Sequence, residues 1–179
     1  ARAVTGAQNS WSSIMVKKLI AGFIIVALIA AGIWYWGYYR SDEAVIRRKV
    51  EGFRETLEKD ENSGNIAGMV RNQALINYIA PEIAITGTYK GIDGVYDRNE
   101  FSSQVFRGVS FCRVIDIDFA HIGIELSSPE LSTVMLEATG YVETKSGKSG
   151  TESRDVTIEL VKLDDDWYIS RITAEPILQ

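Results

Sequence analysis

The side chains best suited to acid–base chemistry lie close together, between residues 113 and 126. His121 is the only histidine, and an imidazole titrates near neutral pH, so it is a candidate general base. Asp116 and Asp118 are two positions apart and would share one face of a strand, as a carboxylate pair requires. Arg113 beside this pair favours a solvated outer face instead. His121 lies where the hydrophobic pattern changes phase, which favours a structural or solvent-facing role.

Three further candidates are ambiguous in the same way. Tyr141 would either line a pocket or pair across strands. The run "DDD" at residues 164–166 resembles a cation site, but three acids in a hairpin turn are usually solvated. Cys112 is the only cysteine, cannot form an internal disulfide, and is expected to be a small buried apolar side chain. No catalytic set, metal site or cofactor is predicted.

Charge is distributed unevenly along the chain. The first forty residues carry four basic residues and no acid, whereas the remainder holds 15 basic and 24 acidic residues, a net charge of −9. Nucleic-acid binding depends on a basic face, so this composition argues against a nucleic-acid partner. Anionic headgroups would also repel the acidic remainder.

Residues 19–39, "LIAGFIIVALIAAGIWYWGYY", contain no charge. At about 1.5 Å per residue they would form a helix of roughly 30 Å, which is long enough to cross the hydrocarbon core of a bilayer. Tryptophan and tyrosine side chains are frequent at membrane interfaces, and basic residues often flank them. The predicted interface residues are Trp34, Tyr35, Trp36, Tyr38, Tyr39 and Arg40. Two alternatives remain: a cleaved signal peptide ending near residues 30–32, and a buried helix of a soluble domain.

The flanks of this segment predict an orientation. Residues 1–18 form an N-terminal tail, of which residues 1–14 are an upstream extension or an expression remnant before Met15. Lys17 and Lys18 favour a cytoplasmic N-terminus. We therefore expect a single-pass protein of the cytoplasmic membrane, with the domain of residues 41–179 on the periplasmic or other extracytoplasmic side. Only Ser41 separates the aromatic rim from the first helix start, so this domain should sit close to the bilayer.

The domain begins with three helical patterns. The first starts at the capping residue Ser41 and ends before "KDENSGN" at residues 59–65. The second runs from Ile66 towards residue 78, with Pro81 closing the segment. The third opens at "DRNE", residues 97–100, which has the form of a capping box.

Alternating patterns predict the strands. "EIAITGTY" is the first, and the glycine-rich "YKGIDGVY" after it is read as a turn. Long strands follow at residues 113–126, 132–146, 154–163 and 167–177. The pattern slips by one position within residues 113–126, which predicts a β-bulge and a sharp bend at Ala120 or His121. Helices followed by a curved antiparallel meander make an α+β domain.

The order and spacing of four segments resemble the nuclear-transport-factor-2-like family, the cone-shaped fold of ketosteroid isomerases and SnoaL-type polyketide cyclases. The segments are "DEAVIRRKVEGFRETLEKDE", "INYIAPEIAI", "DRNEF" and "VTIELVKLDDDWYISRI", and the resemblance covers residues 41–177. It implies a cone whose mouth can hold an apolar ligand and whose sheet often pairs with a partner. The pocket residues that it implies are Phe53, Tyr78, Thr86, Phe101, Val105, His121, Tyr141 and Trp167.

The resemblance does not carry isomerase chemistry over to this chain. In the isomerase branch a tyrosine stabilises an enolate and a carboxylate moves the proton, but the matching positions here are Phe53 and Thr86. We therefore expect a membrane-anchored, non-enzymatic interaction or assembly module that docks on another membrane or envelope protein, or on a second copy. The alternatives are binding or turnover of a small apolar ligand in the cone, and an inner-membrane scaffold subunit of a type IV secretion system.

Overall fold

A computed structural model describes residues 24, 26–30, 37, 41–61, 65–87 and 93–176. The chain divides into two compact units, Ala1–Ala44 and Val45–Gln179, and each is considered by itself. In the first unit, residues 24 and 26–30 are helical. The backbone N–H of Ala44 donates to the hydroxyl of Ser41 at 3.3 Å, which confirms Ser41 as the cap of helix α2 (Asp42–Leu57).

The predicted membrane span falls largely outside the described residues. Among the residues that are described, no helix is both long and apolar enough to cross a bilayer. The predicted interface residues, Trp34, Tyr35, Trp36, Tyr38, Tyr39 and Arg40, also lie outside the described part of the chain. The anchor and the orientation therefore stay predictions.

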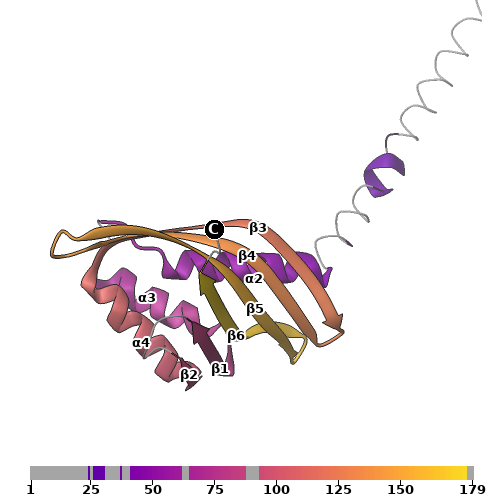
Figure 1. Cartoon of the computed structure of the whole chain (residues 1–179). Coiled ribbons are helices and arrows are strands. Elements are labelled where there is room, and N and C mark those ends of the chain that lie inside the picture. The colour runs from indigo at the N-terminus through magenta and orange to yellow at the C-terminus, as the bar shows by residue number, and fades with distance from the viewer. Residues whose placement is uncertain are drawn as a thin grey trace, which may run out of the picture. The chain divides into compact units, whose positions relative to one another are not determined.

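The second unit is an α+β domain built on one curved sheet of six strands (Figure 1). Its helices after α2 are α3 (Asn65–Ile76) and α4 (Arg98–Phe111). The strands are β1 (Ile79–Gly87), β2 (Gly94–Asp97), β3 (Cys112–Ser128), β4 (Leu131–Thr144), β5 (Ser149–Leu163) and β6 (Asp166–Pro176). They are ordered β2-β1-β6-β5-β4-β3. The long strands β3, β4 and β5 curve over α2, while α3 and α4 lie side by side.

The sheet differs from the predicted antiparallel meander in two respects. Strand β1 runs parallel to β6, so the sheet is mixed. Gly94–Asp97, within the stretch read as a turn, forms the edge strand β2 against β1. Sequence alternation identifies a strand but not the direction of its partner, which explains the first error. Strand β1 also starts at Ile79, before Pro81, and the pairing with β6 is irregular between Ile79 and Ala84, where a proline is tolerated.

The predicted bulge and helix cap are confirmed. The register of β3 against β4 shifts between Ala120 and Gly123, and His121 adopts a left-handed backbone conformation with φ of 55°. The side chain of Asp97 accepts from the backbone N–H of Asn99 at 2.8 Å and so caps α4.

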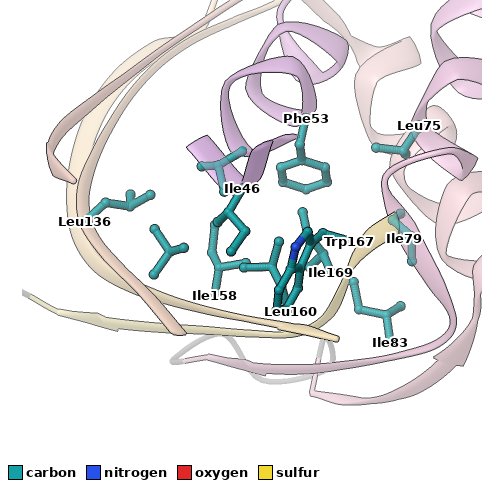
Figure 2. Close-up of a cluster of buried hydrophobic side chains, with 12 residues drawn as sticks. Ile46, Phe53, Leu75, Ile79, Ile83, Leu136, Ile158, Leu160, Trp167 and Ile169 are labelled. Carbon is teal, nitrogen blue, oxygen red and sulfur yellow. The ribbon is translucent and has the colours of Figure 1, made fainter. Parts of the chain in front are cut away.

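The core fills the space between α2 and the inner face of the sheet, defined as the face that packs on the helices. Figure 2 shows Trp167 at its centre, between Phe53 of α2 and Leu160 of β5. Trp167 and Leu160 have no exposed surface. The other buried members are Ile46, Val50, Leu75, Ile79, Ile83, Val134, Leu136, Ile158 and Ile169.

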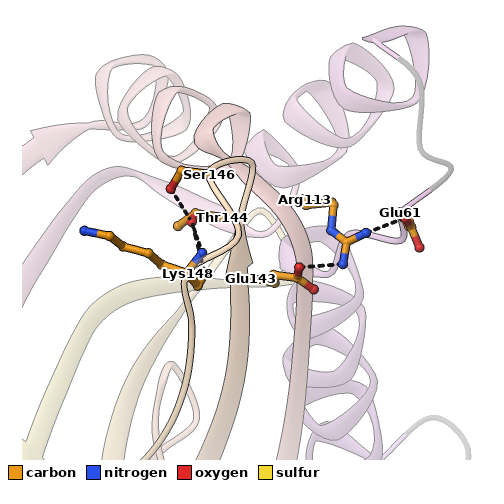
Figure 3. A network of polar contacts seen from close by, with 6 residues as sticks. All are labelled: Glu61, Arg113, Glu143, Thr144, Ser146 and Lys148. Carbon is orange, nitrogen blue, oxygen red and sulfur yellow. Dashed lines mark hydrogen bonds and ion pairs between the residues drawn. The ribbon is translucent and has the colours of Figure 1, made fainter.

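Polar contacts hold the far end of the long strands (Figure 3). Arg113 at the start of β3 bridges Glu61, which follows α2, and Glu143 on β4. The hydroxyl of Thr144 accepts from the backbone N–H of Lys148 at 3.1 Å and closes the β4–β5 hairpin. These contacts join the end of α2 and both strands of the hairpin to β3.

Two leucines on β5 test this core. We expect Leu160→Ala to lower the free energy of unfolding by about 2–5 kcal/mol, because the truncation leaves a cavity in a fully buried site. Leu163→Ala is the matched control, at a residue that is 37% exposed. It should lower the free energy of unfolding by less than about 1 kcal/mol. Urea denaturation measures both, and equal losses would contradict the assignment of the core.

Candidate functional site

The inner face of the sheet continues beyond the packed core. Val134 and Leu136 of β4 belong to the core, and side chains alternate between the two faces along a strand, so Ala138 and Gly140 point to the same face. Ala138 lies opposite Arg154 of β5, and Gly140 lies opposite Glu152. Directly opposed residues share a face, so Arg154 and Glu152 also face inward.

A cavity of about 360 Å³ occupies this part of the inner face. It is named the inner-face cavity below. From β1 and β6 its lining takes Ile85, Thr86, Gly87, Ile172 and Ala174. From β3, β4 and β5 it takes Ile117, Ala138, Gly140, Val142, Glu152, Arg154 and Val156. No described residue of a helix contributes to this lining, which is formed by the strands alone.

Small residues create the hollow. Ala138 and Gly140 follow Leu136 on the same face of β4, and Gly87 lies opposite Ala174 where β1 pairs with β6. A Cβ placed on Gly140 would meet no atom within 4 Å, which shows that the space in front of this glycine is open. The size and the mainly apolar lining match those of small-molecule sites in proteins.

One ion pair interrupts the apolar lining. Arg154 and Glu152 are neighbours on the inner face of β5, and an Arg154 Nη2 donates to the Glu152 carboxylate. The Arg154 side chain is only 19% exposed, while that of Glu152 is 48% exposed. Thr86 also borders the cavity, but it follows the core-packed Ile85 and lies opposite Thr173, so its hydroxyl belongs to the outer face. The Arg154–Glu152 pair can orient a polar end of a ligand.

Two basic side chains hold the backbone of β3, which is an edge strand of the sheet. Arg54 of α2 donates to the carbonyl oxygen of Ile117 at 2.8 Å and pairs with Glu51 at 3.1 Å. Lys59 donates to the carbonyl oxygen of Cys112 at 2.6 Å, and its backbone pairs with Ile115. Burial lowers the pKa of the Lys59 ammonium. Both side chains therefore hold β3 in position without entering the cavity.

Of the pocket residues implied by the family resemblance, Thr86 lies in the lining of the inner-face cavity. Phe53 and Trp167 lie in the core, and Phe101 packs against it. Tyr78 contributes to a separate groove of about 290 Å³ with Val45, Arg48, Lys49 and Asn77. Val105 borders a space of only about 20 Å³ between α3 and α4. The ligand-binding roles of these residues stay predictions.

The remaining two candidates lie elsewhere. His121 occupies the bulge of β3, where its side chain is 84% exposed and 4.0 Å from the carboxylate of Glu137. Tyr141 lies opposite Asp116 and Thr151, so it points away from Gly140 and the cavity. The structure thus separates these two side chains from the cavity lining.

The acidic candidates and the thiol are also accounted for. Asp116 and Asp118 are exposed, as predicted for a solvated outer face. Asp166 pairs with Lys49 at 2.7 Å, and no group of metal-ligating side chains is found among the described residues. Cys112 is partly exposed rather than buried, and its thiol lies 3.6 Å from the carbonyl oxygen of Gly108.

Apart from Thr86, the residues that line the cavity were not predicted from the sequence. The available signal was a change along one face of β4, from Val134 and Leu136 to Ala138 and Gly140. A second signal was a charged residue at a position that the alternation assigns to the core-facing side of a strand. Arg154 falls on the same face of β5 as the buried Ile158. Neither matches a known motif, so both require the strand register before they can be interpreted.

Comparison with solved structures places this geometry among known folds. A protein from Streptomyces avermitilis, provisionally assigned as a dehydratase of the nuclear-transport-factor-2-like family, aligns with a TM-score of 0.59 and 12% identity, covering 77% of this chain and 98% of its own. The domain has the nuclear-transport-factor-2-like fold. No family model matches the sequence, and no curated protein matches it significantly.

Two further structures show the breadth of this likeness. A provisionally assigned scytalone dehydratase from Novosphingobium aromaticivorans aligns with a TM-score of 0.62 and 15% identity, over 77% of this chain and 94% of its own. A provisionally assigned association domain of calcium/calmodulin-dependent protein kinase II from Xanthomonas campestris aligns with a TM-score of 0.59 and 11% identity. The alignment covers 78% of this chain and 90% of that domain's chain. Identities this low show a shared fold and leave the function to the site.

The left-handed conformation of His121 gives a prediction. His121→Gly should keep the free energy of unfolding within about 1 kcal/mol, because glycine adopts this conformation without a steric penalty. His121→Val should lower it by about 1–2 kcal/mol, because a branched side chain is strained there. Urea denaturation of both variants decides the point. Equal stability of the two variants would show that the bulge does not constrain residue 121.

Proposed function

We propose that the folded domain binds a small, mainly apolar molecule in the inner-face cavity. The observation that carries this proposal is the open space in front of Gly140, at a position where continued large side chains would have closed the sheet face. Pockets of about 300–1,000 Å³ with few polar groups are typical of small-molecule sites, and this cavity falls within that range.

The proposal is for binding, because the described lining offers little acid–base chemistry. Its ionisable side chains are Glu152 and Arg154, which are paired with each other. Thr86, at the position of the isomerase carboxylate, cannot act as a base near neutral pH. The dehydratase assignments of two structural neighbours are compatible with a ligand of this kind, but the residues seen here support holding it rather than converting it.

A substitution that fills the cavity tests the proposal. Gly140→Leu should abolish binding of the neutral fluorescent probe N-phenylnaphthylamine, or weaken it at least about tenfold, because the leucine side chain would occupy the open space. Titration of probe fluorescence at constant protein concentration measures the affinity. The free energy of unfolding should not fall, since leucine favours the strand more than glycine does.

Gly123→Leu is the matched control. Gly123 lies on β3 opposite Met135, which points to the outer face, so the same substitution there adds a side chain outside the cavity. It should change probe affinity by less than about twofold, which corresponds to about 0.4 kcal/mol of binding free energy. Equal binding by wild type and both variants would show that the probe binds elsewhere, and the proposal would be abandoned.

We propose, as a second candidate, that the domain is tethered to the cytoplasmic membrane and docks on another membrane or envelope protein, or on a second copy. The observation that favours it is the uncharged segment at residues 19–39 behind Lys17 and Lys18. The likeness to a kinase association domain is consistent with a docking role. A scaffold subunit of a type IV secretion system is the narrowest form of this candidate.

The tether is tested by fractionation and labelling. A chain starting at Met15 should sediment with membranes and resist extraction by alkaline carbonate, whereas a chain starting at Ser41 should stay in the supernatant. A thiol added at the C-terminus should react with an impermeant maleimide in intact cells if the domain is extracytoplasmic. A soluble Met15 chain would contradict the tether, and a protected thiol would contradict the orientation.

A further inference from the structure

We infer that the ligand of the inner-face cavity carries an anionic group, and that Arg154 binds this group in place of its present partner Glu152. The inference rests on the proposed function, since it concerns the same cavity, and it adds the chemical class of the ligand. That class is an apolar molecule with one acidic end, such as a carboxylate or a sulfonate.

Arg154 lies on the face of the sheet that elsewhere carries the core. Arg154 is in phase with Ile158 and so projects from the core-facing side of β5. It lies opposite Ala138, and Glu152 lies opposite Gly140, so small residues leave the space beside both side chains unfilled. A guanidinium in a mainly hydrocarbon wall loses hydration and needs an anion close by.

The two side chains of this ion pair are unequally exposed. The Arg154 side chain is 19% exposed and that of Glu152 is 48% exposed, so the cation lies deeper in the protein and the carboxylate lies nearer to solvent. The two residues are two positions apart on one strand. Release of Glu152 into water therefore requires only side-chain rotation, and its hydration offsets part of the loss of the pair.

A second pair on the same sheet shows what an ordinary surface pair looks like. Arg171 of β6 lies opposite Glu159 of β5, and their side chains are 50% and 44% exposed, with 3.1 Å between the closest atoms. This pair lies on the outer face, because Glu159 alternates with the buried Ile158 and Leu160. Both partners there are accessible to water. The Arg54–Glu51 pair of α2, at 22% and 40% exposed, resembles the cavity pair in exposure, so what distinguishes Arg154 and Glu152 is their place in the lining of the inner-face cavity.

The geometry of the guanidinium limits the ligand. Its planar array of N–H donors matches the oxygens of a carboxylate or sulfonate, and such charge-assisted hydrogen bonds are stronger than neutral ones. The rest of the described lining, apart from Thr86, offers hydrocarbon or backbone surface. A neutral apolar molecule would fill the cavity but would leave the Arg154–Glu152 pair in place.

Two probes that differ by one acidic group test the inference. Anilinonaphthalene sulfonate and N-phenylnaphthylamine share the same ring system, and only the first carries a sulfonate. The double variant Arg154→Met/Glu152→Gln removes both charges and should weaken sulfonate binding about tenfold, or about 1.4 kcal/mol. Its affinity for N-phenylnaphthylamine should change less than about twofold. The single variant Glu152→Gln should tighten sulfonate binding, because it removes the competing carboxylate.

The matched control is Arg171→Met/Glu159→Gln, which makes the same chemical changes at the pair on the outer face. It should leave both affinities unchanged. Circular dichroism and thermal unfolding establish that each variant is folded, and retained N-phenylnaphthylamine binding shows that the cavity is intact.

The outcomes separate the two claims. If N-phenylnaphthylamine binds and Gly140→Leu removes it, but the cavity-side double variant binds the sulfonate like wild type, the inference is overturned and the proposed function stands. Equal weakening by the two double variants would also overturn the inference, because it would reveal a general charge effect. If neither probe binds the wild-type protein, the proposed function fails and the inference fails with it.

Discussion

The inner face of the sheet changes from large to small side chains between Leu136 and Ala138, and both the core and the cavity depend on this change. On one side of it, branched side chains of β4 and β5 pack against Phe53 of α2 and enclose Trp167 without exposed surface. On the other side, no described helical residue lines the cavity, and Gly140 faces open space. The size and the mainly apolar lining of this cavity fall within the range of small-molecule sites, which is the basis of the proposed function.

Polar contacts fix the position of β3, the edge strand that contributes Ile117 to the cavity lining. Arg54 supplies one of these contacts through its hydrogen bond to the carbonyl oxygen of Ile117. Arg113 adds others by joining Glu61 and Glu143 across the start of β3. These polar contacts lie outside the cavity lining, whose described charged side chains are Arg154 and Glu152. The residues that hold β3 in place thus differ from those that line the cavity.

The local features of the fold could be predicted from the sequence, because each depends on a few neighbouring residues. Ser41 and Asp97 are helix caps with the expected donors, and the phase slip near His121 is a bulge. The parallel pairing of β1 with β6 could not be predicted, since both directions give the same alternation. The cavity could not be predicted either. Its lining comes from five strands, β1, β3, β4, β5 and β6, and only the register of their pairing brings these residues together. Phe53 and Trp167, predicted to line a pocket, belong to the buried core cluster, and their ligand-binding roles stay predictions.

The most direct measurement is amide chemical-shift mapping of the labelled domain during titration with N-phenylnaphthylamine. The account predicts that the largest shifts fall on Ala138, Gly140 and Ala174, which line the cavity. The amides of Gly123 and Arg171, which belong to the outer face, should move little. Shifts concentrated on the outer face, or on the helices α3 and α4, would contradict the claim that this cavity is the binding site.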